Sequence, residues 1–143
     1  MTLTLKELQI PKQEMRVITD VFTVLDRIKD RYRIVIVSNH YTWLIESLNN
    51  LKLAPYFEAI IISESVGVAK PDIRIMQILL DKLKLEAESC LYVGDQPMDV
   101  LCSKEIGMDC AWIADKEDIL PELIPYQEDF RISRISDLLN ILL

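Results

Sequence analysis

The sequence predicts a three-layer α/β domain in which helices cover both faces of a largely parallel sheet. Short β-branched runs alternate with segments of helical spacing, in a chain whose 143 residues suit one domain. The connections between these segments are short, and strand–helix–strand order with short connections favours parallel pairing. Polar residues follow several of the runs, and ligands bind beyond the carboxyl ends of the strands in such sheets.

Four runs are typical of strands buried on both faces, because they hold consecutive apolar residues rather than an alternating pattern. These runs are RIVIV (33–37), EAIII (58–62), CLYV (90–93) and DCAWIA (109–114). The C-terminal piece, RISRISDLLNILL (131–143), is predicted to form a last edge strand and a closing helix.

Apolar stripes with a spacing of three to four residues predict helices between these strands. The first stripe follows a start signal at Thr19-Asp20, and the third lies behind Pro71-Asp72. The stripes are Val21, Val24, Leu25 and Ile28; Tyr41, Leu44, Leu48 and Leu51; and Ile75, Leu79 and Leu83 with Met76 and Leu80. A further helix is predicted from Pro97 to Gly107, because proline favours the first turn of a helix and glycine its C-terminal end.

The composition limits the classes of partner. The net charge is −7 and no basic run is present, which argues against binding to nucleic acid or to an anionic membrane surface. No apolar run approaches the roughly 18 residues that would span a bilayer, and the first residues lack the basic-then-apolar order of a signal peptide. Cys90, Cys102 and Cys110 form no C-x-x-C pair and are expected to be reduced core residues of a cytoplasmic protein.

Polar residues that could bind phosphate and a metal ion follow three of the predicted strands. Ser38 and Asn39 come directly after RIVIV, where a hydroxyl and an amide can donate hydrogen bonds to a phosphoryl oxygen. Lys70 follows the next strand along the chain, and its ammonium could neutralise phosphate. Asp95 and Asp99 come after CLYV and a glycine, and magnesium accepts one or two carboxylates together with waters and phosphate oxygens.

Each of these residues also has a purely structural interpretation. Asn39 could cap a helix, and Lys70 could be a solvated loop lysine. Asp99 would complement the dipole of the helix that begins at Pro97 whether or not a ligand binds. His40, the only histidine, is expected to be solvated. Because the serine, the lysine and the aspartate pair all follow strands at the same edge, we expect them to converge on one site.

From about residue 17 to the end, the chain resembles the core domain of the haloacid dehalogenase-like (HAD) hydrolase superfamily. The matching segments are IVIVSNH, SESVGVAKPD and CLYVGDQPMDVLCSKEIGMDCAWI, in the family's order. The resemblance implies a Rossmann-like core over residues 17–143, with residues 1–16 as the remnant of a cap or linker segment. The stretch VGDQPMDV looks most like the phosphoglycolate phosphatase and β-phosphoglucomutase branch. That likeness implies Mg²⁺-dependent hydrolysis of a small phosphorylated metabolite.

The resemblance also implies a role for each matching residue. Ser38 would bind the phosphoryl group, and Asn39 would donate to its oxygens. Lys70 would neutralise both the phosphoryl group and the nucleophile. Asp95 and Asp99 would hold Mg²⁺, directly or through water.

One family motif, D-x-D-x-T at the end of a leading strand, has no match in this sequence. It supplies the aspartate that forms an aspartyl-phosphate and the acid that protonates the leaving group. The stretch that begins at Asp20 is a poor candidate, because it continues as a helical stripe and begins only 18 residues before Ser38. We therefore expect the first central strand, between those matching RIVIV and CLYV, to be missing and the chain alone to be inactive.

Several explanations of this departure stay open. The chain could be a fragment of a longer hydrolase, or half of a split enzyme in which a homodimer or a companion chain covers the missing strand. It could also be a catalytically dead HAD-fold domain that serves binding or regulation. A phosphorelay receiver domain shares the sheet and a lysine. It expects an acidic cluster after the first strand and a phosphorylated aspartate mid-chain, and neither is present before Lys70.

Overall fold

The computed structural model describes residues 2–3 and 20–143. It contains a six-stranded sheet of order β3-β2-β1-β4-β5-β6, in which every pairing is parallel. The strands are β1 (Thr2–Leu3), β2 (Val35–Ser38), β3 (Ala59–Ile62), β4 (Leu91–Gly94), β5 (Asp109–Ile113) and β6 (Phe130–Ile132). The predicted fold class is confirmed, and each of the four predicted buried runs forms a strand.

Helices lie between most of these strands within the described residues, whereas a loop joins β5 to β6. The α-helices are α1 (Asp20–Ile28), α2 (Trp43–Asn50), α3 (Ser63–Val66), α4 (Arg74–Leu83), α5 (Pro97–Ile106) and α6 (Leu138–Leu142). Short 3₁₀ turns are η2 (Ala54–Tyr56), η3 (Ala87–Ser89) and η4 (Ile135–Asp137). Helix α5 confirms its predicted limits, because it begins at Pro97 and ends before Gly107, whose φ of 101° is the left-handed conformation that closes many helices.

Tyr41, the first member of the second predicted stripe, lies outside α2. Tyr41 is 63% exposed, and the helix begins at Trp43. The turn before α2 is held instead by the segment that follows β3, because the hydroxyl of Thr42 donates to a carboxylate oxygen of Glu64 at 3.0 Å. A tertiary contact therefore overrides the helical spacing at this end.

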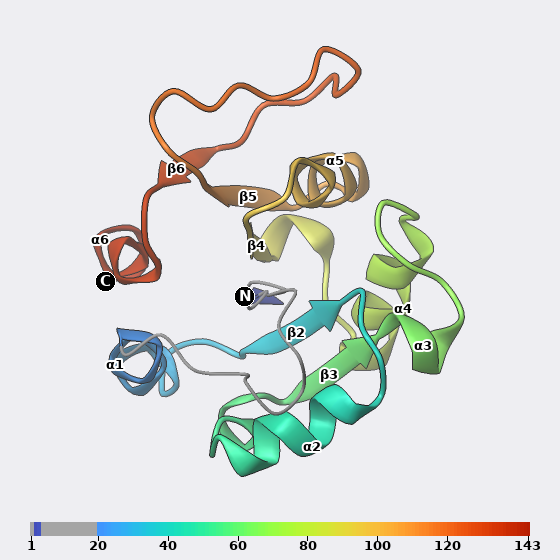
Figure 1. Cartoon of the computed structure of the whole chain (residues 1–143), viewed down its shortest axis with the longest axis vertical. Helices are drawn as coiled ribbons and strands as arrows, with labels where there is room; N and C mark the ends of the chain where they lie inside the picture. Colours follow the sequence, from blue (N-terminus) through green and yellow to red (C-terminus); the bar gives the residue numbers. More distant parts are fainter. Residues whose placement is uncertain (1, 4–19) are drawn as a thin grey trace.

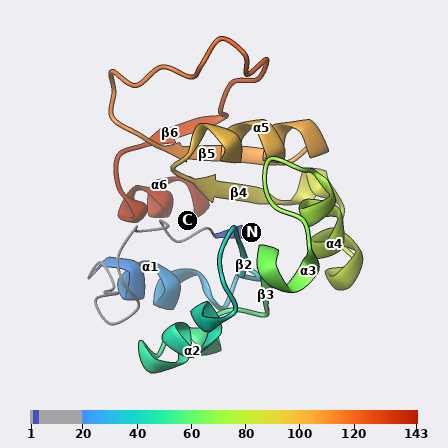
Figure 2. The ribbon, with the colours of Figure 1, turned by 45° about the vertical axis from the view of Figure 1, so that its right-hand side comes forward.

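Helices cover both faces of the sheet, which gives the three predicted layers (Figures 1 and 2). Helices α1, α2 and α6 pack on one face, whereas α4 and α5 pack on the other. Residues of β2 alternate between these layers, since Ile36 joins the first cluster while Val35 and Val37 join the second. In β4, the side chain of Tyr92 lies on the α4–α5 face and that of Val93 on the opposite face.

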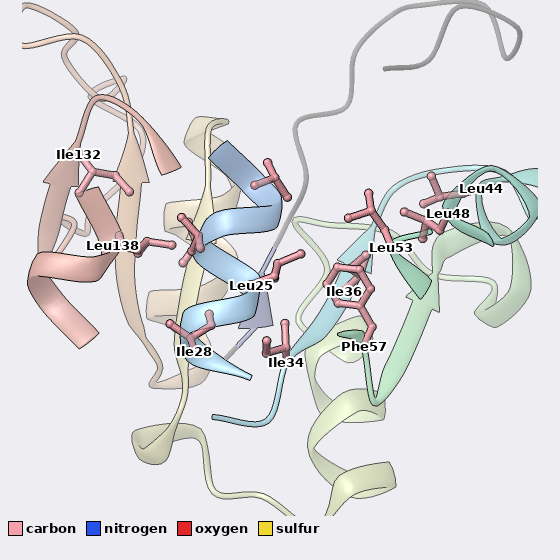
Figure 3. Packing of buried hydrophobic residues seen from close by; sticks show 14 of the residues in the cluster. Leu25, Ile28, Ile34, Ile36, Leu44, Leu48, Leu53, Phe57, Ile132 and Leu138 are labelled. Carbon is pink, nitrogen blue, oxygen red and sulfur yellow. The ribbon is translucent and has the colours of Figure 1, made fainter. Parts of the chain in front are cut away.

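The larger core cluster explains why α1 is a helix. Leu25 and Ile28 of α1 are fully buried. Figure 3 shows them in the layer that also holds Ile34 and Leu138. Burial of one such side chain contributes about 1.5–3 kcal/mol. The stretch that begins at Asp20 therefore forms a core helix, as its apolar stripe predicts, and not a strand that turns into a catalytic loop.

The centre of the sheet differs from the expectation of a missing first strand. The two residues of β1 lie between β2 and β4 and pair with both. Two residues are too few to leave a periodic pattern, so this strand has no local signal in the sequence. The sequence directly after Leu3 reads Thr-Leu-Lys-Glu. Strand β1 therefore holds the central place in the sheet without bringing the D-x-D-x-T motif.

The position of β1 also bears on the predicted division of the chain. Residues 2–3 pair within the core sheet, although residues 1–16 were expected to be a cap or linker remnant. Residues 4–16 lie outside the described part of the chain.

None of the described helices is both long enough and apolar enough to cross a membrane. All three cysteines are free and buried, as expected.

Candidate phosphate and metal site

The register of the sheet places Ser38 and Asp95 at the same level on either side of the central strand. Thr2 of β1 is aligned with both Val35 of β2 and Tyr92 of β4. Ser38 and Asp95 each lie three residues further along their strands. Two strand spacings amount to about 10 Å. The polar residues that end β2 and β4 therefore flank the line of β1 at the carboxyl edge of the sheet.

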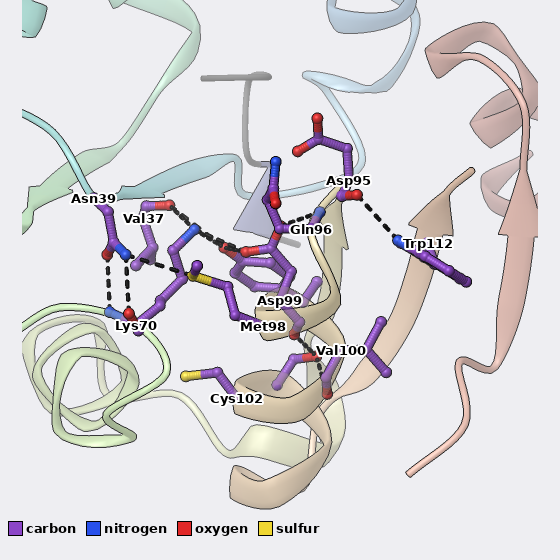
Figure 4. A network of polar contacts seen from close by, with 12 residues as sticks. Val37, Asn39, Lys70, Asp95, Gln96, Met98, Asp99, Val100, Cys102 and Trp112 are labelled. Atoms are coloured by element: carbon purple, nitrogen blue, oxygen red, sulfur yellow. Dashed lines mark hydrogen bonds and ion pairs between the residues drawn. The ribbon is translucent and has the colours of Figure 1, made fainter. Parts of the chain in front are cut away.

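The ammonium of Lys70 bridges the elements that meet at this edge. It donates to Oδ1 of Asp99 at 2.9 Å, to the hydroxyl of Tyr92 at 2.7 Å and to the carbonyl of Val37 at 3.3 Å (Figure 4). The Lys70 side chain is only 3% exposed. A buried charge needs a partner, and here the Asp99 carboxylate supplies it. An ammonium has three hydrogens, so each already has an acceptor within the protein.

Asn39 fixes the backbone of Lys70. Its Nδ2 donates to the Lys70 carbonyl at 2.9 Å, and its Oδ1 accepts the Lys70 N–H at 2.8 Å. The following peptide bond, Lys70-Pro71, is cis. The side-chain amide of Asn39 thus ties the turn after β2 to the loop before α4. Nδ2 carries a second hydrogen, which lies toward Sδ of Met98 at 3.6 Å, so a phosphoryl oxygen would compete only with that weak contact.

Asp99 lies in the first turn of α5 and is 1% exposed. Its Oδ1 accepts from Lys70 and also from the Tyr92 hydroxyl at 3.2 Å. Its Oδ2 accepts the backbone N–H of Gln96 at 3.0 Å, as part of a capping box. Both carboxylate oxygens therefore have partners inside the protein. Asp99 thus has the structural role at the start of α5 that the sequence allows. It also forms an ion pair with Lys70, which the sequence does not predict.

Gly94 allows this close approach of α5 to β4. A Cβ atom at this position would lie 2.6 Å from Cβ of Asp99, which is well inside van der Waals contact. Any larger residue at the end of β4 would therefore displace the Asp99 side chain. The glycine serves the packing around the buried ion pair rather than an unusual backbone conformation.

Asp95 directly follows β4 and is partly exposed. Its backbone carbonyl accepts the indole N–H of Trp112 at 3.1 Å, and Figure 4 shows its carboxylate directed away from that of Asp99. The Asp99 carboxylate pairs with Lys70, and joint binding of Mg²⁺ by Asp95 and Asp99 stays a prediction. No group of three or more His, Cys, Asp or Glu among the described residues could hold a metal ion. Metal binding by Asp95, with waters and phosphate oxygens, stays a prediction.

Two aromatic residues of the site escaped the sequence reasoning. Tyr92 lies inside a strand and Trp112 inside the next, and we assigned both places to the apolar core. Each nevertheless uses its polar atom, since the hydroxyl contacts Lys70 and the indole contacts Asp95. The available signal was chemical rather than periodic, because a buried phenol or indole needs a hydrogen-bond partner.

His40 is only half-buried and packs against Trp43, with 4.5 Å between the ring centroids. Its Nδ1 accepts the backbone N–H of Tyr41 at 2.8 Å. The backbone N–H of His40 donates to the hydroxyl of Ser63, which follows β3. The ring is therefore part of the turn after β2, and not the freely solvated side chain that the sequence led us to expect.

Comparisons with known proteins agree with this fold. The family model of the haloacid dehalogenase-like hydrolases matches residues 3–113, which is more than half of the chain. Pyrophosphatase PpaX from Bacillus pumilus (strain SAFR-032) is 30% identical over 135 residues, which cover 91% of this chain and 62% of that protein.

Solved structures agree as well. A HAD phosphatase from Thermococcus onnurineus has a TM-score of 0.81 at 26% identity, covering 92% of this chain and 60% of that one. YfnB from Bacillus subtilis, solved with magnesium bound, shares the fold with a TM-score of 0.84 at 22% identity, over 92% of this chain and 58% of that one.

The chain spans about 60% of the length of these proteins. The strand that ends at Ser38, the loop of Lys70 and the turn of Asp95 all lie inside the residues that the family model matches. On the match of the family model, with the fold in agreement, the chain belongs to the haloacid dehalogenase-like hydrolase family.

Proposed function

We propose that this chain is the core part of a Mg²⁺-dependent phosphomonoester hydrolase, and that by itself it binds Mg²⁺ and a small phosphorylated molecule without turnover. The observation that carries the proposal is the buried Lys70 ammonium, which Asp99 and Tyr92 hold at the carboxyl edge of the sheet. The pyrophosphatase and phosphatase relatives support phosphate chemistry. Three free cysteines fit a reducing compartment such as the cytoplasm.

Each residue has a role that follows from its position. A fixed ammonium in a buried place stabilises negative charge more strongly than one in water, because the local dielectric constant is low. The hydroxyl of Ser38 can donate to a phosphoryl oxygen at the end of β2. Asp95 would hold Mg²⁺ with water and phosphate oxygens, and Asp99 would act on the site through Lys70. The bound ion would offset the charge of the phosphoryl group.

We do not expect turnover from this chain alone, because its sequence contains no D-x-D-x-T motif. Without the first aspartate no acceptor for a covalent phosphoryl group stands in line with the site. Without the second, no acid protonates the leaving group. A further segment or a companion chain that supplies this motif would complete the site.

The fluorescence of Trp112 offers a direct test of metal binding. Its indole donates to the Asp95 carbonyl, so an ion on the Asp95 carboxylate changes the surroundings of the ring. Trp43→Phe removes the other tryptophan of the chain. We expect a saturable response to millimolar Mg²⁺ in inorganic phosphate that Asp95→Asn abolishes and Asp109→Asn keeps. Asp109 is the matched control, because it is exposed at the amino end of β5, at the other edge of the sheet. No response, or equal responses in both variants, would overturn the proposal.

Hydrolysis of p-nitrophenyl phosphate tests the absence of turnover. We expect the rate with the purified chain to stay at the background rate, and the Lys70→Met variant to give the same rate. A rate above background that Lys70→Met removes would show that the chain is active alone. That result would contradict this half of the proposal and leave the metal site standing.

A binding or regulatory domain on the same scaffold is the second candidate. The observation that favours it is the closed network around Lys70, in which each ammonium hydrogen already has an acceptor in the protein. Such a network is stable without any ligand. This candidate predicts that Mg²⁺ and phosphate leave the melting temperature unchanged, whereas a surviving site predicts that they raise it.

A further inference from the structure

We propose that Tyr92 is a positioning residue, which holds the Lys70 ammonium in place while the hydrogen now bonded to the Val37 carbonyl can be transferred to a bound oxyanion as its acceptor. The part concerning the oxyanion rests on the proposed function, whereas the hold on Lys70 does not. Tyr92 is fully buried within β4. Its hydroxyl lies 2.7 Å from Nζ of Lys70 and 3.2 Å from Oδ1 of Asp99.

The chemistry of the groups fixes the direction of each hydrogen bond. An ammonium can only donate, so the Tyr92 oxygen accepts from Lys70. The phenol hydrogen is then available to Oδ1 of Asp99 at 3.2 Å, with the Val37 carbonyl as a more distant alternative at 3.5 Å. The phenol therefore contacts both the cation and the anion, which also contact each other at 2.9 Å, and it orients both.

The three hydrogen bonds of the ammonium are unequal. Those to Tyr92 and Asp99 measure 2.7 and 2.9 Å, whereas the bond to the Val37 carbonyl measures 3.3 Å and is the weakest. Val37 directly precedes Ser38, the residue that we expect to bind the phosphoryl group. An oxyanion at Ser38 would compete for the hydrogen that Val37 now accepts, while the other two bonds keep the ammonium in place.

Tyr92→Phe separates this role from packing. The variant keeps the ring in the core but removes the hydroxyl, so one ammonium hydrogen loses its acceptor in a buried place. A phenol with a merely structural role would change only the stability of the fold. A positioning phenol also governs how tightly the ammonium of Lys70 is held, and that property can be observed in the folded protein.

Nitrogen-15 NMR of the lysine ammonium groups is the test. In the wild-type chain we expect a protected, slowly exchanging resonance for Lys70, which Lys70→Arg identifies by its loss. In Tyr92→Phe we expect exchange with water to become about tenfold faster or the resonance to vanish. Tyr126→Phe is the control, because Tyr126 is partly exposed on the loop before β6. Equal protection in Tyr92→Phe and Tyr126→Phe would overturn the inference.

A phosphate titration separates this inference from the proposed function. With Mg²⁺ present, inorganic phosphate should shift the wild-type Lys70 resonance, and Tyr92→Phe should weaken phosphate binding about tenfold. If the wild type shows no phosphate response but Tyr92→Phe loses the protection of Lys70, the positioning role of Tyr92 is supported and the phosphate site is rejected. Equal phosphate affinity in the two proteins would overturn the role of Tyr92 in anion binding.

A wild-type measurement keeps the inference testable if Tyr92→Phe does not fold. In protein labelled with carbon-13 at the tyrosine Cζ atoms, a slowly exchanging hydroxyl gives separate signals for its hydrogen and deuterium forms in mixed water. We expect this splitting for Tyr92, because its hydroxyl is buried and contacts both Lys70 and Asp99. A single averaged signal for Tyr92 would contradict a held hydroxyl.

Discussion

The ammonium of Lys70 lies 2.9 Å from Oδ1 of Asp99, and both side chains are almost fully buried. Either charge would be costly to bury without the other. The pair joins the loop before α4 to the first turn of α5, and the hydroxyl of Tyr92 contacts both members. The geometry at the carboxyl edge of the sheet is thus set by the protein itself, before any ligand binds.

Removal of one member of this pair should be strongly destabilising. Lys70→Met leaves the Asp99 carboxylate buried without a counter-charge, and we expect a loss of about 3–5 kcal/mol in the free energy of unfolding, measured with urea. The double variant with Asp99→Leu should recover much of this loss. Arg33→Met is the control, because its ion pair with Glu58 is exposed and screened by solvent, so its loss should change stability little. Similar losses for the two single variants would contradict a buried, coupled pair.

Gly94→Ala should disturb the site through space alone. The added methyl group would collide with Asp99, and overpacking of this kind costs about 1–3 kcal/mol. We also expect the protected Lys70 resonance to weaken, since Asp99 must move. Gly67→Ala is the comparison, because its Cβ meets nothing within 4 Å but its φ of 79° strains an alanine. That variant should lose stability and keep the Lys70 resonance. An unchanged resonance in Gly94→Ala would rule out the close approach.

The buried thiols should make stability fall in alkali. Burial raises the pKa of Cys102 and that of Cys110 from 9.0 to about 12. A pKa raised by folding leaves stability intact below the unfolded value, so the loss should develop between about pH 9 and pH 12. Cys102→Ala should reduce this loss in pH-dependent urea unfolding. At neutral pH the thiols should react with a disulfide reagent only as fast as the chain unfolds, and rapid labelling of the folded protein would oppose this account.

Asp129 should show the opposite dependence on pH. Burial raises the pKa of its carboxyl, but hydrogen bonds from Lys104 and from the Cys110 backbone outweigh this, so the pKa lies below its ordinary value. A lowered pKa gives stability that is present above the unfolded value of about 3.9 and is lost as the pH falls through the folded one. Asp129→Asn should therefore cost stability at neutral pH, with the difference from wild type closing in acid. A difference that stays constant with pH would refute this.

The strands and most helices were predictable because they leave strong local patterns. The helix from Pro97 to Gly107 carries its own start and stop signals, and the stripe of α1 marks its buried face. Strand β1 leaves no such pattern, since its place depends on ladder partners in β2 and β4 that are distant in sequence. Tyr41 lies outside α2 despite its place in the apolar stripe for a similar reason, because a contact with the segment after β3 holds the turn before the helix.

The site was predictable only as a gathering of residues at one edge. The order of strands brings Ser38, Lys70 and Asp95 to that edge, and the sequence pattern contains this information. The direction of each side chain is not in the pattern. Asp99 turns toward Lys70 because Gly94 leaves room for its side chain and the backbone N–H of Gln96 donates to its Oδ2.

Amide chemical-shift mapping of inorganic phosphate binding, in the presence of Mg²⁺, tests the central claim most directly. The claim is that the segments after β2, before α4 and after β4 form one oxyanion site. We predict saturable shifts that cluster at Ser38, Lys70 and Asp95 and that Asp95→Asn weakens. An absence of shifts, or shifts confined to the opposite edge of the sheet around Asp109, would contradict it.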